Sequence, residues 1–154
     1  MRFHQVRELV RWAADYHARL EAAYTGLATN SVAPRLRLAL DYLADHERRM
    51  RRELESYLAE GSGHRRVLDA WFDEPDDFPH PPVLECLPEA RDDEGVEALL
   101  ATALTMHRTL QDLYRHRGER ASGTEEREFF EALVQGEDAE VRRLVRDIQR
   151  LEAY

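Results

Sequence analysis

Residues 6–24, VRELVRWAADYHARLEAAY, recur ninety positions later as residues 96–114, VEALLATALTMHRTLQDLY. The two stretches agree at six places: Val6/Val96, Leu9/Leu99, Ala13/Ala103, His17/His107, Leu20/Leu110 and Tyr24/Tyr114. Steps of three and four residues trace one stripe along an α-helix. At the same offset, the downstream residues Leu43, Glu47 and Leu54 recur as Leu133, Glu137 and Leu144. The repeat predicts two related helical hairpins, with polar residues at positions where a core is expected.

The composition indicates a single domain, residues 1–154, that is soluble and cytoplasmic. The chain is 43% hydrophobic and 34% charged, which is too apolar for disorder and too charged for a membrane protein. No run approaches the roughly 18 apolar residues of a membrane span, and the N-terminus shows no apolar signal segment. Cys86 is the only cysteine, so no internal disulfide is expected and a reducing compartment is the default.

Charge and motif content exclude several classes of function. The 22 basic and 31 acidic residues give a net charge of −9, which argues against nucleic acid as a partner. We find no glycine-rich phosphate loop, no Ser/His/Asp or Cys/His arrangement and no zinc-type cysteine pair. The sequence therefore indicates no organic cofactor, and it identifies no substrate.

Four long helices are expected, over about residues 3–29, 32–60, 93–121 and 124–153. Ser31 is the expected N-cap of the second helix, with Pro34 in its first turn. Glycines at positions 61 and 63 are expected to end that helix. For the third helix, Asp92 or Asp93 is the expected N-cap. For the fourth, Ser122 and Glu125 are expected to form a capping box.

The segment joining the two hairpins, about residues 61–92, is long enough to travel the full height of a bundle. It contains Trp71, Phe72 and a proline-rich run at residues 78–82. Two hairpins joined by one long crossover form the ferritin-like version of the four-helix bundle. The expected fold is therefore all-α: a ferritin-like four-helix bundle made of two pseudo-repeated hairpins.

The four helical blocks resemble the ferritin-like superfamily, above all its rubrerythrin-type members, over everything except the crossover. In that family each hairpin offers one Glu from its first helix and a Glu-x-x-His from its second, and together they hold two metal ions. The resemblance puts His17 and His107 at the lone-Glu positions. Glu47-x-x-Met50 and Glu137-x-x-Glu140 fall on the two Glu-x-x-His positions. Both motif histidines are thus absent, and both lone glutamates are replaced by histidine.

The residues themselves support a candidate metal site. Glu137 and Glu140 share one helix face and can converge on one ion. The full set of candidate ligands is His17, Glu47, His107, Glu137 and Glu140, a mixed N/O set that suits Fe, Mn or Zn. A single ion, or a weak second one, is expected because Met50 is better suited to filling the core. Glu21, one turn after His17, could compensate in the first hairpin.

The sequence also makes predictions for three residues near the candidate ligands. Tyr24 and Tyr114 lie two turns along the same stripes and either donate hydrogen bonds to the carboxylates or pack in the core. His46 directly precedes Glu47 and is expected to point away from the candidate site.

Two functions remain open. In the first, the chain is a non-haem metal-binding protein with a rearranged His/Glu site. The resemblance then implies redox or metal-handling work, and in an enzyme the metal would carry O₂ or peroxide chemistry. In the second, His17 and Glu47 pair with each other, as do His107 and Glu137, in a metal-free network. The chain would then be an association or structural module. In both cases a homo-oligomer, a dimer, is expected.

Overall fold

The computed structural model describes residues 3–31, 33–72 and 95–152, and within these ranges the chain is helical. Five helices are present: α1 (Val6–Asn30), α2 (Pro34–Leu58), α3 (Arg65–Leu68), α4 (Val96–Glu119) and α5 (Thr124–Glu152). The prediction of an all-α chain with four long helices is confirmed. The short α3 was not expected, because it falls inside the segment assigned to the crossover.

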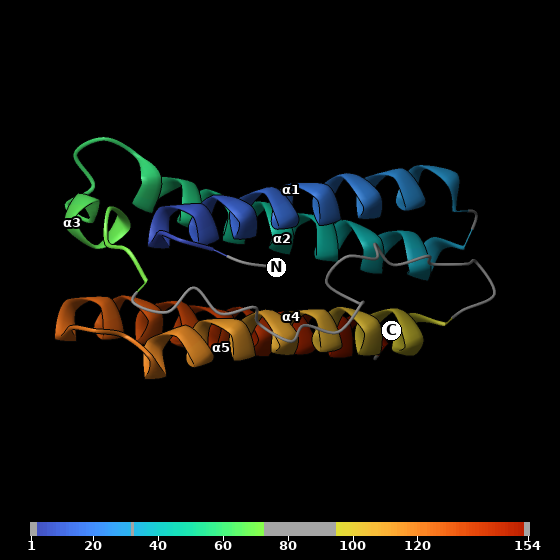
Figure 1. Cartoon of the computed structure of the whole chain (residues 1–154). Coiled ribbons are helices and arrows are strands. Elements are labelled where there is room, and N and C mark those ends of the chain that lie inside the picture. The colour runs from blue at the N-terminus through green and yellow to red at the C-terminus, as the bar shows by residue number, and fades with distance from the viewer. Residues whose placement is uncertain (1–2, 32, 73–94, 153–154) are drawn as a thin grey trace.

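The four long helices form two antiparallel pairs that lie against each other (Figure 1). α1 packs mainly against α2 and α4 against α5, while α2 and α5 make the main contact between the pairs. α2 ends near α3 at one end of the molecule, and α4 begins at the opposite end (Figure 1). The chain between them therefore joins opposite ends, as a long crossover requires. Residues 73–94 of the expected crossover lie outside the described residues.

Three of the expected helix caps are wrong. Ser31 follows α1 as its C-cap, and Ala33 is the N-cap of α2, because Pro34 takes the first helical turn. Gly95 is the N-cap of α4, and the predicted caps at positions 92 and 93 lie outside the described residues. At α5 the Ser122 backbone N–H donates to Glu126 Oε2 at 3.0 Å, not to the expected residue 125. Since α5 begins at Thr124, Ser122 lies one residue before the N-cap position.

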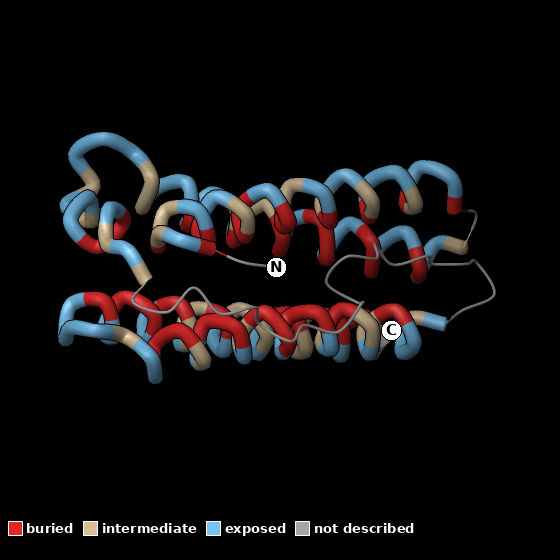
Figure 2. Tube along the Cα trace, in the orientation of Figure 1, coloured by how far each residue is buried: buried red, intermediate tan, exposed pale blue. Residues whose placement is uncertain are grey.

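Buried residues line the inner faces of both pairs (Figure 2). They form two apolar clusters, one toward each end of the bundle. One includes Leu20, Tyr24, Leu40, Leu43, Ala103, Met106, Leu144 and Ile148. The other includes Leu9, Ala13, Leu54, Leu110, Tyr114, Phe129, Phe130 and Leu133. Each long helix contributes to both clusters, so it passes from one to the other near its middle.

The segment after α2 holds the start of α1 in place. Gly61 and Gly63 adopt positive φ angles of 82° and 83° in the turn that follows α2, a conformation that favours glycine. Val67 and Leu68 of α3 are buried in the second cluster. The Val6 N–H donates to the carbonyl of Ala70 at 3.1 Å, so α1 begins with one of its free N–H groups satisfied. In the described part of the chain, no helix is both long and apolar enough to cross a bilayer.

Two helical glycines give opposite predictions for stability. Gly26 of α1 has open space around the position of an added Cβ, whereas a Cβ on Gly118 of α4 would lie 3.2 Å from the Phe130 Cβ. Gly26→Ala is expected to raise the free energy of unfolding by about 0.5–1 kcal/mol through helix propensity. Gly118→Leu is expected to lower it by about 1–3 kcal/mol through overpacking. Urea denaturation followed by circular dichroism measures both. Equal effects of the two substitutions would contradict the close α4–α5 contact.

Candidate functional site

Two histidines and two glutamates close a ring where the two hairpins meet. Within the hairpins, His17 Nδ1 lies 2.5 Å from Glu47 Oε2, and His107 Nδ1 lies 3.2 Å from Glu137 Oε2. Between the hairpins, His107 Nε2 lies 2.8 Å from Glu47 Oε1, and His17 Nε2 lies 3.6 Å from Glu137 Oε1. Each imidazole therefore faces both carboxylates, and each carboxylate faces both imidazoles.

Each long helix supplies one member of this ring, which we call the His/Glu ring. On α2, α4 and α5 that residue lies between the stretches that join the two apolar clusters, and on α1 His17 lies where the first of these stretches begins, next to Tyr16. The four side chains are at most 4% exposed. The ring is thus a polar layer between two apolar layers. Its four residues lie on the same helical stripes, spaced by three and four residues, as the core residues of each helix.

The ring carries two positive and two negative charges. Each imidazole has an ionisable carboxylate within 3.6 Å of both of its nitrogens, and nearby negative charge favours the form with a proton on each nitrogen. Burial by itself lowers the pKa of an imidazole. Here the carboxylates of Glu47 and Glu137 outweigh it, raising the pKa of His17 to about 9 and that of His107 to about 10. Burial likewise raises the pKa of Glu47 and Glu137, but the two imidazolium groups hold both below the usual range.

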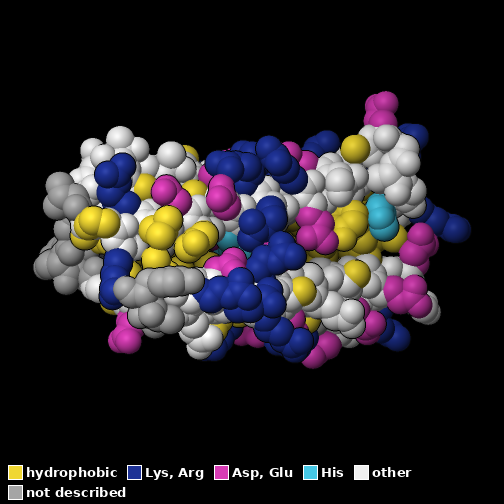
Figure 3. Space-filling model, turned by 180° about the vertical axis from the view of Figure 1, so that it is seen from behind, with side chains coloured by type: hydrophobic (Ala, Val, Ile, Leu, Met, Phe, Trp, Pro, Cys, Tyr) yellow, Lys and Arg dark blue, Asp and Glu magenta, His cyan; other side chains and the backbone are white. Residues whose placement is uncertain are grey.

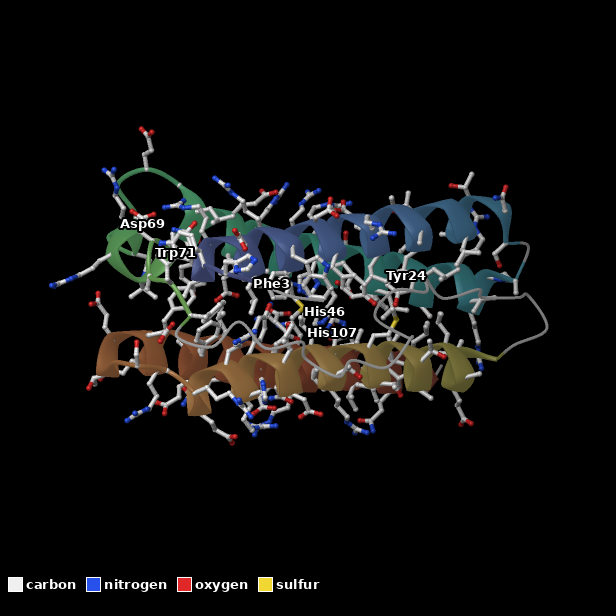
Figure 4. The ribbon with its side chains drawn as sticks, viewed as in Figure 1. Phe3, Tyr24, His46, Asp69, Trp71 and His107 are labelled. Carbon is white, nitrogen blue, oxygen red and sulfur yellow. The ribbon has the colours of Figure 1, made fainter. Side chains whose placement is uncertain are left out.

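His46 lies beside the ring, and the expectation that it points away is wrong. It is completely buried, and its ring meets that of His107 edge-on, with centroids 5.0 Å apart (Figure 4). Burial lowers the pKa of His46, so it is the neutral histidine of the group. The spacing of Ala39, Leu43, His46 and Met50 by three or four residues is the sequence signal that could have placed it in the core.

Glu140 contacts His46 and not the His/Glu ring. Its Oε2 lies 3.1 Å from His46 Nδ1 and 3.5 Å from an Arg49 guanidinium nitrogen, and Arg143 approaches its other oxygen at 3.7 Å. Arginine side chains also gather across the middle of the face of the molecule that Figure 3 shows. Of the five predicted ligands, the structure thus brings four together and puts the fifth between His46 and the surface arginines.

The remaining residues predicted near the candidate ligands are Met50, Glu21, Tyr24 and Tyr114. Met50 is buried, with 5% of its surface exposed. Glu21 pairs with Arg48 at 2.8 Å and with Arg51 at 3.2 Å, so it does not reach the ring. Tyr24 and Tyr114 are buried in the core, and neither hydroxyl has a hydrogen-bond partner among the described residues. Burial, and then the nearby carboxylates, raise the pKa of both tyrosines.

In the described part of the chain, no three His, Cys, Asp or Glu side chains are arranged so that they could hold a metal ion as they stand. Comparisons with protein-family models, curated proteins and solved structures return no match.

The charged ring predicts a decline in stability at alkaline pH in metal-free protein. His17 and His107 keep their protons in the folded state up to about pH 9 and 10, whereas an unfolded histidine loses its proton near pH 6.5. Their contribution is complete below pH 6.5 and is lost as the pH rises through the folded pKa values. Between pH 7.5 and 8.5 the free energy of unfolding should fall by up to about 3 kcal/mol per pH unit, because the folded state holds two more protons.

Denaturation of chelator-treated protein at a series of pH values measures this slope. The exposed His4 gives a matched control, and His4→Gln should leave the slope unchanged. A stability that is flat from pH 7 to pH 9 would show that the two buried imidazoles are neutral.

Proposed function

We propose that the chain is a ferritin-like metal-binding protein in which one divalent transition-metal ion takes the place of two protons in the His/Glu ring. The observation that carries this proposal is the unequal spacing of the ring. Glu47 lies at hydrogen-bond distance from both imidazoles, at 2.5 and 2.8 Å, whereas Glu137 lies farther from both, at 3.2 and 3.6 Å.

On the Glu137 side of the ring, the contacts of 3.2 and 3.6 Å involve different oxygens of one carboxylate and come close to the separation of two ligands on one ion. Two ligands about 2.1 Å from a tetrahedral ion lie about 3.4 Å apart. The two contacts of Glu137 bracket that value. His17 Nε2, His107 Nδ1 and the Glu137 carboxylate would hold the ion after a small withdrawal of that carboxylate. The donor set of two imidazoles and a carboxylate suits Fe, Mn or Zn.

Glu47 has the position of the group that orients metal-bound histidines. A histidine ligand commonly donates its other ring N–H to a carboxylate, which fixes the tautomer and the ring direction. Glu47 Oε2 is hydrogen-bonded to His17 Nδ1, and Glu47 Oε1 lies 2.8 Å from His107 Nε2, close enough to accept from it after a small change of angle. With the ion bound, each imidazole would keep that one proton and lose the other.

This exchange conserves charge in a buried site. The metal-free ring holds two imidazolium and two carboxylate groups, and the metal-bound ring would hold one divalent ion, two neutral imidazoles and two carboxylates. Both states have zero net charge, so neither leaves an uncompensated charge in the core, which would be costly. Ion binding would release two protons for each ion taken up.

The bound ion determines the chemistry. Iron or manganese supplies one-electron redox chemistry, and zinc supplies Lewis acidity alone. Redox or metal-handling work is therefore the function proposed for the iron- or manganese-bound protein. The chain's own residues bind and orient the ion, and the two apolar clusters lie on either side of it toward the ends of the bundle.

A metal-free association module is the second candidate, and one observation favours it. The ring closes on itself, and each buried charge faces two of opposite sign. Such a network satisfies its own charges without an ion. Large apolar side chains are also exposed at Leu38, Tyr42 and Trp71, at 43%, 36% and 65%. A second copy of the chain is the proposed partner in this case.

Elemental analysis of untagged protein tests the first proposal. Wild-type protein is expected to contain about one equivalent of Fe, Mn or Zn. Glu137→Gln should reduce the content at least tenfold, because the amide lacks the charge that the ion needs. Glu140→Gln is the matched control, since Glu140 contacts His46 instead of the ring. Thermal melting should show both variants folded. Wild-type protein with far less than one equivalent after reloading with each of the three ions would leave the metal-free module as the function.

A further inference from the structure

A small cavity connects the His/Glu ring with the surface between α2 and α5. Its volume is about 20 Å³. Its inner wall includes His17, Glu137 and Tyr114, and its outer end is formed by Glu53 and Gly136, which are exposed and half-buried. The apolar side chains of Met50, Leu54 and Leu133 complete the lining. This volume holds one water molecule, because one needs about 10–15 Å³.

Two buried polar atoms of residues that line this cavity have no hydrogen-bond partner among the described residues. Tyr114 Oη and His17 Nε2 are unsatisfied, and each of these residues is 1% exposed. The gap of 3.6 Å between His17 Nε2 and Glu137 Oε1 is too wide for a direct hydrogen bond. A buried water usually makes two to four hydrogen bonds, and this cavity offers a tyrosine hydroxyl, an imidazole N–H and a carboxylate.

The cavity lies next to a position at which the two repeated hairpins carry different residues. Gly136 directly precedes Glu137, and His46 occupies the same place before Glu47, ninety positions earlier. On that side the His46 imidazole fills the space next to His107 and contacts Glu140. On the other side Gly136 has no side chain, and the cavity lies next to His17.

Packing does not require a glycine at position 136. A Cβ added there would meet only the Glu53 carboxylate oxygens, at 3.6 and 3.9 Å, which is ordinary contact. A glycine in a helix interior costs about 1 kcal/mol relative to alanine. What the glycine does here is leave the outer end of the cavity without a side chain at position 136.

We propose that this cavity is a binding pocket for one neutral, hydrogen-bonding molecule of the size of water, and that Gly136 keeps its entrance open. The carboxylates of Glu53 at the entrance and Glu137 at the inner wall disfavour anions. In metal-free protein the lining consists of the chain's own side chains, His17 and Glu137 among them. In metal-bound protein the same opening gives a small neutral ligand a route from solvent to Glu137.

The test uses water as the probe, in crystals at about 1.5 Å resolution or better and in solution by NMR. Wild-type protein should show one ordered water within hydrogen-bond distance of Tyr114 Oη, together with water cross-peaks to the Tyr114 side chain. Gly136→Leu should remove both signals by filling the entrance. Gly136→Ala should keep the water and raise the melting temperature. Ala139→Leu adds the same side chain at an exposed position of α5 and should change neither signal.

A dry cavity in wild-type protein would overturn the proposal, as would a water that remains in folded Gly136→Leu. If Gly136→Leu fails to fold, the wild-type and Gly136→Ala measurements still decide whether the pocket holds water. As the reciprocal change, His46→Gly should admit a second water next to His107. All of these measurements use chelator-treated protein, so their outcome is separate from the outcome of the metal analysis.

Discussion

The contact between two imidazoles and two carboxylates at the centre of the bundle is the constraint on which the remaining structure depends. Four ionisable side chains with almost no exposure are tolerable only if their charges balance and their polar atoms meet. That condition fixes how the two hairpins sit on each other, because two of the four contacts cross between them. Displacing one hairpin by a helical turn would leave a carboxylate or an imidazolium without its partner. The apolar clusters at both ends supply burial energy, and the ring specifies which alignment of the hairpins is stable.

The ring is symmetric in composition and asymmetric in its surroundings. Glu47 lies close to both imidazoles, whereas Glu137 lies farther from them and borders the cavity. On the Glu47 side, His46 fills the space next to His107 and connects through Glu140 to surface arginines. In the proposed metal-bound protein, Glu47 would orient the imidazoles and Glu137 would bind the ion. The two proposals made for this protein both follow from that division.

The sequence predicted the all-helical fold, and it predicted that four of the five candidate residues lie together, for the same physical reason. Residues that recur at a helical spacing share a face, so the placement of His17, Glu47, His107 and Glu137 on inward stripes followed from periodicity alone. His46 was missed because a residue adjacent to Glu47 was assumed to lie on another face. A helix packed against two neighbours buries a face wide enough to include both. Glu140 was grouped with Glu137 by spacing along one helix, but its partner lies on α2, which spacing within α5 cannot reveal. The cavity at Gly136 depends on an absent side chain, and sequence patterning does not signal such a gap.

If one divalent ion takes the place of two protons in the ring, binding must release those protons to the solvent. Calorimetric titration of metal-free protein with Zn²⁺ near pH 7, in buffers of different ionisation enthalpy, counts the protons released on binding. Two protons per ion are expected, because His17 and His107 would each begin with two N–H groups and end with one. Binding at one equivalent without proton release would show that the imidazoles are neutral in the metal-free ring, and it would contradict the exchange of protons for an ion.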